Sequence, residues 1–290
     1  MQRLMFLAGC LAWASCTTAR PPAATPYGDL ETRVLSLEAT NAKNAAALEF
    51  LSKVYETQQK QQADEDASTL AEDGTYALAV NEAVAAGQVD GPATAAVTIV
   101  KAFDFACPYC QIVSPVLQEL VAEHKGDVRV VFLNFVVHDP AMPGHLASCA
   151  AAKQGKYLEF KKAFWDKAYA PYAASRDPSK LGEANIVAIA RDLKLDTAKL
   201  VVDMGGPDCK ARIAADMAEL RTFKVGATPT FFVNGQVIAG ALPKEGFELV
   251  IKEKLERVKA SGVPAAEYYA KEILGKGEKQ FRSKTTPRPR

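Results

Sequence analysis

The sequence predicts an α/β fold with an inserted helical subdomain, preceded by a long N-terminal helix. Residues 97–105 (VTIVKAFDF) and 128–137 (VRVVFLNFVV) are apolar, β-branched runs typical of buried strands, and a helical segment at 107–124 separates them. Residues 228–242 (TPTFFVNGQVIAGAL) have the pattern of a β-hairpin with an Asn-Gly turn. The stretch between, about 140–225, has helical spacing.

The composition is that of an ordinary globular protein. The 290 residues are 49% hydrophobic and 24% charged, enough for one large domain or two small ones. The 35 basic and 34 acidic residues give a net charge of +1, so nothing indicates nucleic acid as a partner. No internal apolar stretch approaches the length needed to span a bilayer.

Residues 1–16 have the pattern of an export leader. Arg3 precedes an apolar run that ends near Ala14. Export would place the mature chain on the periplasmic side of the cell envelope, where disulfides persist. The alternative is a cytosolic start that happens to be apolar.

Two cysteines in this leader resemble the lipid-attachment site of bacterial lipoproteins. Too few apolar residues precede Cys10, so we favour lipidation of Cys16. Lipidation there would remove Cys10 and leave four other cysteines, an even number. Ordinary cleavage after Ala14 is the alternative and would leave Cys16 as a free thiol.

Residues 17–26 are rich in proline and alanine and are expected to form a tether. Residues 27–62 have the pattern of a coiled coil, which predicts that the protein is a homo-oligomer. Spacing in the second segment alternates between three and four at Tyr27, Leu30, Val34, Leu37, Asn41, Asn44, Leu48, Leu51 and Tyr55. A single amphipathic helix packed on its own domain is the alternative. Residues 63–95 are expected to be a linker, 96–260 the compact domain, and 261–290 a C-terminal helix with a disordered basic tail.

The CPYC motif, Cys107 to Cys110, carries the chemistry. A structural zinc site needs four ligands, and the chain offers no second C-x-x-C, so we expect no metal and no other cofactor. Cys107 lies where a strand meets a helix, and the helix N-terminus favours a thiolate there. Cys107 would then attack a disulfide, and Cys110 would resolve the mixed disulfide.

A proline opens the first strand of the later hairpin. Pro229 after Thr228 suggests a cis peptide bond, although a trans proline at an edge strand would fit as well. The combination of a βαβ unit with C-P-x-C, a helical insertion and T-P before a hairpin resembles the thioredoxin fold of DsbA-like periplasmic thiol–disulfide oxidoreductases. The resemblance covers about residues 97–260.

The resemblance implies roles for individual residues. Cys107 matches the exposed nucleophile of the family and Cys110 its buried partner. Pro229 matches the cis-proline beside the pair, and Thr228 the residue whose backbone meets the substrate peptide. Asp104 matches an acidic residue often found three positions before the pair, with a role left open. The implied partners are client proteins with thiols or disulfides and a membrane redox partner that resets the pair.

Cys149 and Cys209 both fall in the helical insertion, 60 residues apart. In an oxidising compartment they are expected to form a structural disulfide. Two buried free thiols or a second redox pair are the alternatives.

Three features bear on the direction of exchange. Tyr109 cannot supply the charge that a histidine at this position supplies in strongly oxidising relatives. Thr228 and the N-terminal coil also resemble isomerase and reductase members, so we favour an isomerase or reductase. The insertion is common among oxidases, which keeps oxidase activity as the alternative. A lipid-anchored coiled-coil binding protein, or a copper-handling protein that uses the two thiols, is the alternative of another class.

Overall fold

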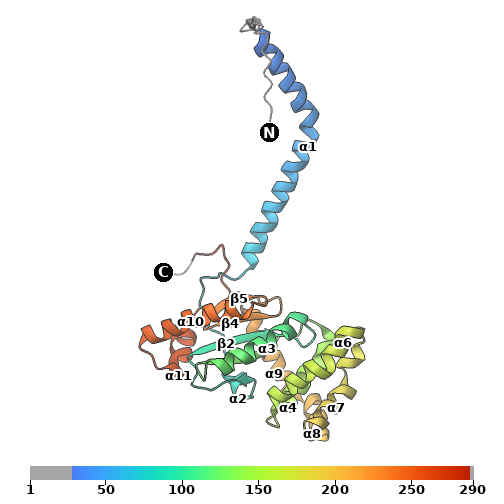
Figure 1. The fold of residues 1–290 in the computed structure, drawn as a ribbon, viewed down its shortest axis with the longest axis vertical. Helices are drawn as coiled ribbons and strands as arrows, with labels where there is room; N and C mark the ends of the chain where they lie inside the picture. Colours follow the sequence, from blue (N-terminus) through green and yellow to red (C-terminus); the bar gives the residue numbers. More distant parts are fainter. Residues whose placement is uncertain (1–27, 288–290) are drawn as a thin grey trace, which may run out of the picture. The chain divides into compact units, whose positions relative to one another are not determined.

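The computed structural model describes residues 28–287 and consists of two units that divide after Gln61 (Figure 1). The expected leader, the tether, the lipidation site Cys16 and the first residue of the coil, Tyr27, lie outside the described residues. Across residues 28–287, no helix combines the length and the apolar character that a membrane span requires.

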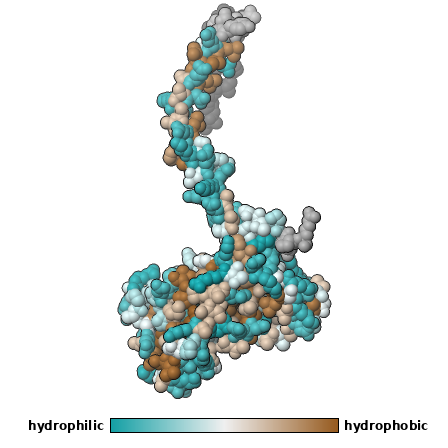
Figure 2. Space-filling view, turned by 180° about the vertical axis from the view of Figure 1, so that it is seen from behind, coloured by the Kyte–Doolittle hydropathy of each residue, from teal (hydrophilic) through white to brown (hydrophobic). Residues whose placement is uncertain are grey.

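Helix α1 (Gly28–Ser68) confirms the predicted long N-terminal helix. Its heptad positions are exposed, and Figure 2 shows apolar side chains along the helix between polar ones. Six large apolar residues of the seam fall within the described part of the chain, and they are between 50 and 68% exposed: Leu30, Val34, Leu37, Leu48, Leu51 and Tyr55. An exposed apolar seam of this kind fits coiled-coil association, which remains a prediction.

The compact unit contains a five-stranded sheet in the order β1-β3-β2-β4-β5. The strands are β1 (Val89–Asp90), β2 (Val97–Phe103), β3 (Val128–Asn134), β4 (Thr230–Val233) and β5 (Gln236–Ala239). Strands β2 and β3 are parallel and joined through helix α3 (Pro108–Glu123), which is the predicted strand–helix–strand unit. The hairpin β4–β5 pairs antiparallel to β2, so the strands read from the sequence are confirmed.

The two faces of the sheet belong to two apolar cores, because successive side chains of a strand point to opposite faces. Ile99 and Phe103 of β2 lie in one core, beneath α3 and the first half of α10 (Lys244–Ser261). Val100 and Ala102 lie in the other, together with α2 (Asn81–Ala85) and the end of α9 (Pro207–Thr222).

The insertion between β3 and β4 is helical, as predicted. Its elements are η1 (Asp139–Ala141), α4 (Met142–Ala152), α5 (Tyr157–Phe164), the π-helical turn η2 (Trp165–Tyr169), α6 (Ala170–Ser175), η3 (Pro178–Leu181), α7 (Glu183–Asp192), α8 (Thr197–Gly205) and α9. Most of its buried side chains extend the first core, which surrounds Cys107 and Cys110.

The segment 63–95 differs from the expected linker. Helix α1 continues to Ser68, and Tyr76, Leu78 and Val80 are buried in the second core. These three residues alternate with small or polar ones, the pattern of an extended segment with one buried face. The compact unit therefore begins well before residue 96.

The C-terminal segment is also more ordered than expected. After α11 (Ala265–Tyr268) and the π-helical turn η4 (Tyr269–Leu274), the chain returns to the segment that follows α1. Leu70 forms an isolated β-bridge with Ser283, and buried Arg282 donates to Asp73 over 2.7 Å. Arg282 belongs to the segment that the sequence predicts to be a disordered basic tail, and this ion pair fixes it to the compact unit instead.

Candidate active site

The CPYC motif occupies the turn that leads from strand β2 into helix α3. Cys107 is the N-cap residue of α3, with an extended backbone, and its sulfur accepts a hydrogen bond from the backbone N–H of Cys110 over 3.4 Å. Pro108 occupies the first helical position, where its missing N–H costs nothing. The local sequence thus sets Cys107 at the helix N-terminus and Cys110 on the following turn.

Both thiols are free, and both are more enclosed than the family resemblance implies for the nucleophile. Cys107 is 3% exposed and Cys110 is fully buried. The expectation of an exposed Cys107 is wrong for this conformation, because the backbone oxygen of Thr228 lies 3.2 Å from its sulfur. This carbonyl belongs to a loop 121 residues away, which a local reading of the motif cannot place.

The surroundings of the two thiols push their pKa values apart. A hydrogen bond from the Cys110 thiol, assisted by the side chain of Thr228 and by the backbone N–H groups of Cys110 and Tyr109, lowers the pKa of Cys107 to about 6 against the opposing effect of burial. Burial, together with the hydrogen bond to Cys107, raises the pKa of Cys110 well above its usual value. Cys107 is therefore a thiolate at neutral pH and Cys110 a thiol.

Thr228 and Pro229 lie beside the pair and are joined by a cis peptide bond. Strand β4 begins one residue later and pairs with β2, which ends next to the CPYC turn. This pairing brings the Thr228–Pro229 loop over Cys107. The two residues picked out by sequence and the two cysteines therefore form one site.

Asp104 is fully buried and holds the turn before Cys107. Its carboxylate accepts hydrogen bonds from the backbone N–H groups of Ala106 (2.7 Å), Val137 (2.6 Å) and His138 (2.8 Å). Burial opposes its ionisation, but His145 and the backbone donors outweigh burial and lower the pKa of Asp104 to about 2. Its role, left open by sequence, is to tie the CPYC turn to the loop after β3.

A buried polar chain that sequence did not predict leads away from Asp104. His145 accepts the N–H of Phe105 (3.2 Å) and contacts the side-chain oxygen of Asn134 over 2.7 Å, and Asn134 donates to Asp216 over 2.6 Å. These groups come from β3, α4, α9 and the turn after β2, so spacing along the chain carried no signal for them.

Two buried lysines lie in the first core, and sequence analysis missed both. Lys101 in strand β2 is 1% exposed, and Lys161 in helix α5 is 3% exposed. The signal for Lys101 was available: it is the one charge in the seven-residue strand VTIVKAF. A charge at the centre of a buried strand is unusual unless it has a partner.

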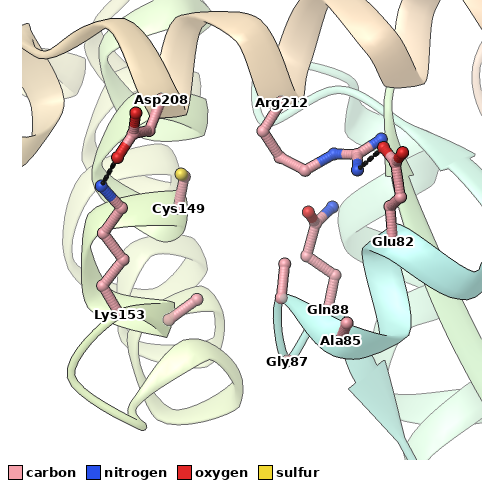
Figure 3. Close-up of a pocket in the computed structure, with 10 residues that line it drawn as sticks. Glu82, Ala85, Gly87, Gln88, Cys149, Lys153, Asp208 and Arg212 are labelled. Carbon is pink, nitrogen blue, oxygen red and sulfur yellow. Dashed lines mark hydrogen bonds and ion pairs between the residues drawn. The ribbon is translucent and has the colours of Figure 1, made fainter.

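The structure joins Cys149 of α4 and Cys209 of α9 in a disulfide with a Cα–Cα distance of 5.6 Å. A hollow of about 470 Å³ lies beside Cys149 (Figure 3). Its charged groups pair with each other, Lys153 with Asp208 and Arg212 with Glu82. None of its lining residues belongs to the CPYC turn or the Thr228–Pro229 loop. Among residues 28–287, no group of three or more His, Cys, Asp or Glu side chains has metal-site geometry.

Curated proteins that resemble this chain match between about half and three fifths of it. The Na(+)/H(+) antiporter NhaA of Herminiimonas arsenicoxydans is 26% identical over 177 residues, which cover 61% of this chain and 27% of the antiporter. The probable disulfide bond formation protein D of Bacillus cereus is 28% identical over 161 residues, which cover 52% of this chain and 69% of that protein. The chain thus spans about a quarter of the length of the antiporter relatives, 27% and 22% for two of them.

A solved structure and a family model both match the thioredoxin-like sheet described above. Oxidised BdbD from Bacillus subtilis superimposes with a TM-score of 0.50 and 22% identity over 63% of this chain and 98% of that chain. This likeness concerns the fold, a thioredoxin sheet with a DsbA-like helical insertion. The family model described as thioredoxin matches residues 84–253, more than half of the sequence. The chain belongs to the thioredoxin family.

Proposed function

We propose that this protein is a thiol–disulfide oxidoreductase that exchanges disulfides with client proteins through Cys107 and Cys110. The observation that carries the proposal is the geometry of the pair: Cys107 is the N-cap of α3 and its sulfur accepts the N–H of Cys110 over 3.4 Å, Cys110 is fully buried on the following turn, and the cis peptide bond Thr228–Pro229 lies beside them. These surroundings lower the pKa of Cys107 to about 6 and raise that of Cys110. A thiolate attacks disulfides and a thiol does not, so the pair has one nucleophile and one resolving group. The Bacillus cereus relative, named as a probable disulfide bond formation protein, supports this class.

Exchange proceeds in two balanced steps. The Cys107 thiolate attacks one sulfur of a client disulfide, forming a mixed disulfide and releasing the other client sulfur as a thiolate. Cys110 then loses its proton and attacks Cys107, which closes the protein disulfide and releases the reduced client. The reverse sequence oxidises a dithiol client. A membrane redox partner would reset the pair between cycles.

The client is proposed to bind along the Thr228–Pro229 loop. The oxygen of Thr228 lies 3.2 Å from the sulfur of Cys107, so a client backbone that pairs with this loop would bring its disulfide to the nucleophile. Tyr109 and Ile112 are 61% and 59% exposed and offer apolar surface beside the pair. Because Cys107 is almost fully buried, the Thr228–Pro229 loop must move away from its sulfur when the client enters.

We favour isomerase or reductase activity over oxidase activity. Tyr109 brings no positive charge to the pair, so the thiolate lacks the stabilisation that a histidine would give and the pair is less oxidising. The exposed heptad seam of α1 supports a homo-oligomer, in which several active sites could face one misfolded client.

The test is refolding of a scrambled, disulfide-bonded substrate by the full chain, with Cys107→Ser as the inactive control. Rescue of the scrambled substrate supports an isomerase. Oxidation of a reduced substrate without rescue of a scrambled one supports the oxidase alternative. Reduction of a disulfide-bonded substrate without rescue supports a reductase. If the protein neither rescues, oxidises nor reduces these substrates, disulfide exchange is not its function.

Export and lipid attachment at Cys16 complete the proposal, on the evidence of the leader sequence alone. The mass of the mature protein tests it. Loss of the first 15 residues together with a lipid-sized increment on Cys16 is the expected result. An unmodified start at Ser15 would contradict it.

A further inference from the structure

The hollow beside Cys149 is enclosed by three parts of the compact unit (Figure 3). Residues 82–88 form one side, the C-terminal end of α4 forms the opposite side, and the first half of α9 closes a third. The Cys149–Cys209 disulfide holds α4 and α9 together. The volume of about 470 Å³ lies within the range of about 300–1,000 Å³ that small-molecule sites occupy.

The side chain of Gln88 lines the hollow with an unpaired oxygen. Gln88 is 1% exposed, and its amide nitrogen donates to the backbone oxygen of Phe132 over 2.8 Å and to the carboxylate of Asp216 over 3.0 Å. Because both partners are acceptors, turning the amide over would set oxygen against oxygen. The oxygen Oε1 has no hydrogen-bond partner among the residues that the structure describes, and Figure 3 shows it on the side that faces Cys149 across the hollow. A ligand that donates to this oxygen therefore satisfies a buried acceptor.

Arg212 supplies the matching donor. Its two terminal nitrogens are engaged, one with Glu82 over 2.7 Å and the other with Asp216 over 2.6 Å. Its Nε–H group is buried and has no acceptor within residues 28–287. Gln88 and Arg212 both bind the carboxylate of Asp216, so the free acceptor and the free donor belong to side chains that one group holds in place.

The charges around the hollow neutralise each other. Lys153 pairs with Asp208 over 2.8 Å, and Arg212 pairs with Glu82 over 2.7 Å. A charged ligand would have to compete with these ion pairs, whereas a neutral ligand would not. The other lining residues of the sides formed by residues 82–88 and α4 include small ones that leave room for groups of methyl size: Ala85, Ala86, Gly87 and Ala152.

We propose that the hollow binds a short, neutral peptide in extended conformation, with small apolar side chains. The N–H and C=O of one residue in an extended peptide point to the same side, as in a hydrogen-bonded pair of strands. This N–H would donate to Oε1 of Gln88, and the C=O would accept from Nε–H of Arg212. A carboxylate only accepts and an ammonium only donates, so neither satisfies both atoms.

The peptide is either a free short peptide or an exposed segment of a longer chain, which offer the same chemistry. The inference does not depend on the proposed function, because no lining residue of the hollow takes part in thiol exchange at Cys107 and Cys110.

The test uses the full chain labelled with ¹⁵N and the probe N-acetylalanine N-methylamide, which presents one residue with both backbone groups. A saturable shift of the side-chain NH₂ signals of Gln88 and of the Nε–H signal of Arg212 is expected. An analogue with an ester oxygen in place of the alanine N–H should bind about tenfold more weakly, because it leaves Oε1 without a donor. Acetate at the same concentrations should shift neither signal.

Ala86→Phe places a large side chain at the hollow and should weaken binding of the probe by at least about tenfold. Ala86 is a half-buried lining residue at the end of α2. The matched control is Ala214→Phe, the same change at an exposed position of α9 that does not line the hollow, and it should leave the affinity unchanged. Melting temperatures establish that both variants are folded.

Equal affinity for the peptide and the ester would overturn the inference, as would tighter binding of acetate than of the peptide. A probe that does not bind, or that binds without moving the signals of Gln88 and Arg212, would overturn it as well. If Ala86→Phe does not fold, the comparison of peptide and ester on the wild type decides alone. A capped peptide of six residues with the same alanine at its centre then identifies the source: tighter binding supports a segment of a longer chain, and equal binding supports a free short peptide.

Discussion

Cys107 and Cys110 carry the same side chain three positions apart, yet one becomes a thiolate and the other a thiol. The hydrogen bond between them acts in both directions, because it stabilises the charge on Cys107 and the proton on Cys110. Burial acts on both, but only Cys107 has enough donors to overcome it. The asymmetry therefore comes from the contacts around each sulfur.

The reactivity of Cys107 should follow its thiolate. Alkylation by iodoacetamide is expected to rise with pH through a midpoint of about 6, because the thiol form below that pH does not react. Cys110→Ala should move the midpoint upward by removing the main hydrogen-bond donor. Cys110→Ser keeps a donor and serves as the matched control, with a midpoint near that of the wild type. A midpoint near 9 in the wild type would contradict the assigned contacts.

Asp104→Asn should destabilise the fold by about 2 kcal/mol at neutral pH, the value that corresponds to a pKa lowered from 3.8 to about 2. An amide cannot offer acceptors on both sides to the N–H groups that now face the two carboxylate oxygens. Since the folded pKa is depressed, the stabilisation is complete above pH 3.8 and is lost as pH falls toward 2.

Urea unfolding at several pH values measures the effect of Asp104→Asn. The difference from the wild type should shrink below pH 4, as the carboxyl protonates in the unfolded state and then in the folded state. Asp139→Asn, at an exposed carboxylate in the following loop, should change stability by less than about 0.5 kcal/mol. A pH-independent difference for Asp104→Asn would argue against a buried carboxylate there.

At the scale of elements, the Cys149–Cys209 disulfide links helices α4 and α9 across 60 residues of sequence. A disulfide that closes a loop of this length lowers the conformational entropy of the unfolded chain, which stabilises the folded state by about 4 kcal/mol. The double variant Cys149→Ala/Cys209→Ala should lose that amount in urea unfolding, while Cys107 keeps its reactivity. Reductant should lower the stability of the wild type to that of the variant and leave the variant unchanged. A loss below about 1 kcal/mol would mean that the helices hold each other without the bond.

At the scale of the whole molecule, the exposed seam of α1 should join several copies. Leu37→Glu with Leu48→Glu places charges on the seam and should convert the oligomer to a monomer in sedimentation equilibrium. Ala46→Glu changes a residue of the same helix off the seam and should leave the oligomer intact. The monomeric variant should lose rescue of scrambled clients but keep oxidation of reduced ones. A monomeric wild type would remove the oligomer from the proposed mechanism.

Local patterns predicted the elements of the fold because apolar periodicity follows from the geometry of helices and strands. The strand runs beginning at Val97 and Val128, the Asn234-Gly235 hairpin turn and the helix after Cys107 all lie close to their predicted places. Acidic and turn residues surround the short alternating run at Tyr76, and this composition predicts a linker. The residues that pack against Tyr76, such as Phe223 and Phe232, lie about 150 positions later in the sequence. No local signal could therefore mark this segment as part of the core.

The sequence by itself determined the α/β class, the helical insertion and the position of the reactive pair, since strand, turn and helix signals are written in neighbouring residues. Only the tertiary structure decided how enclosed Cys107 is, which groups set the two thiol pKa values and that Lys101 and Lys161 share one core. Burial and charge interactions act through space between residues far apart in the chain, as with Cys107 and Thr228 at a separation of 121. A protonation state therefore depends on the folded surroundings, which the order of residues does not display.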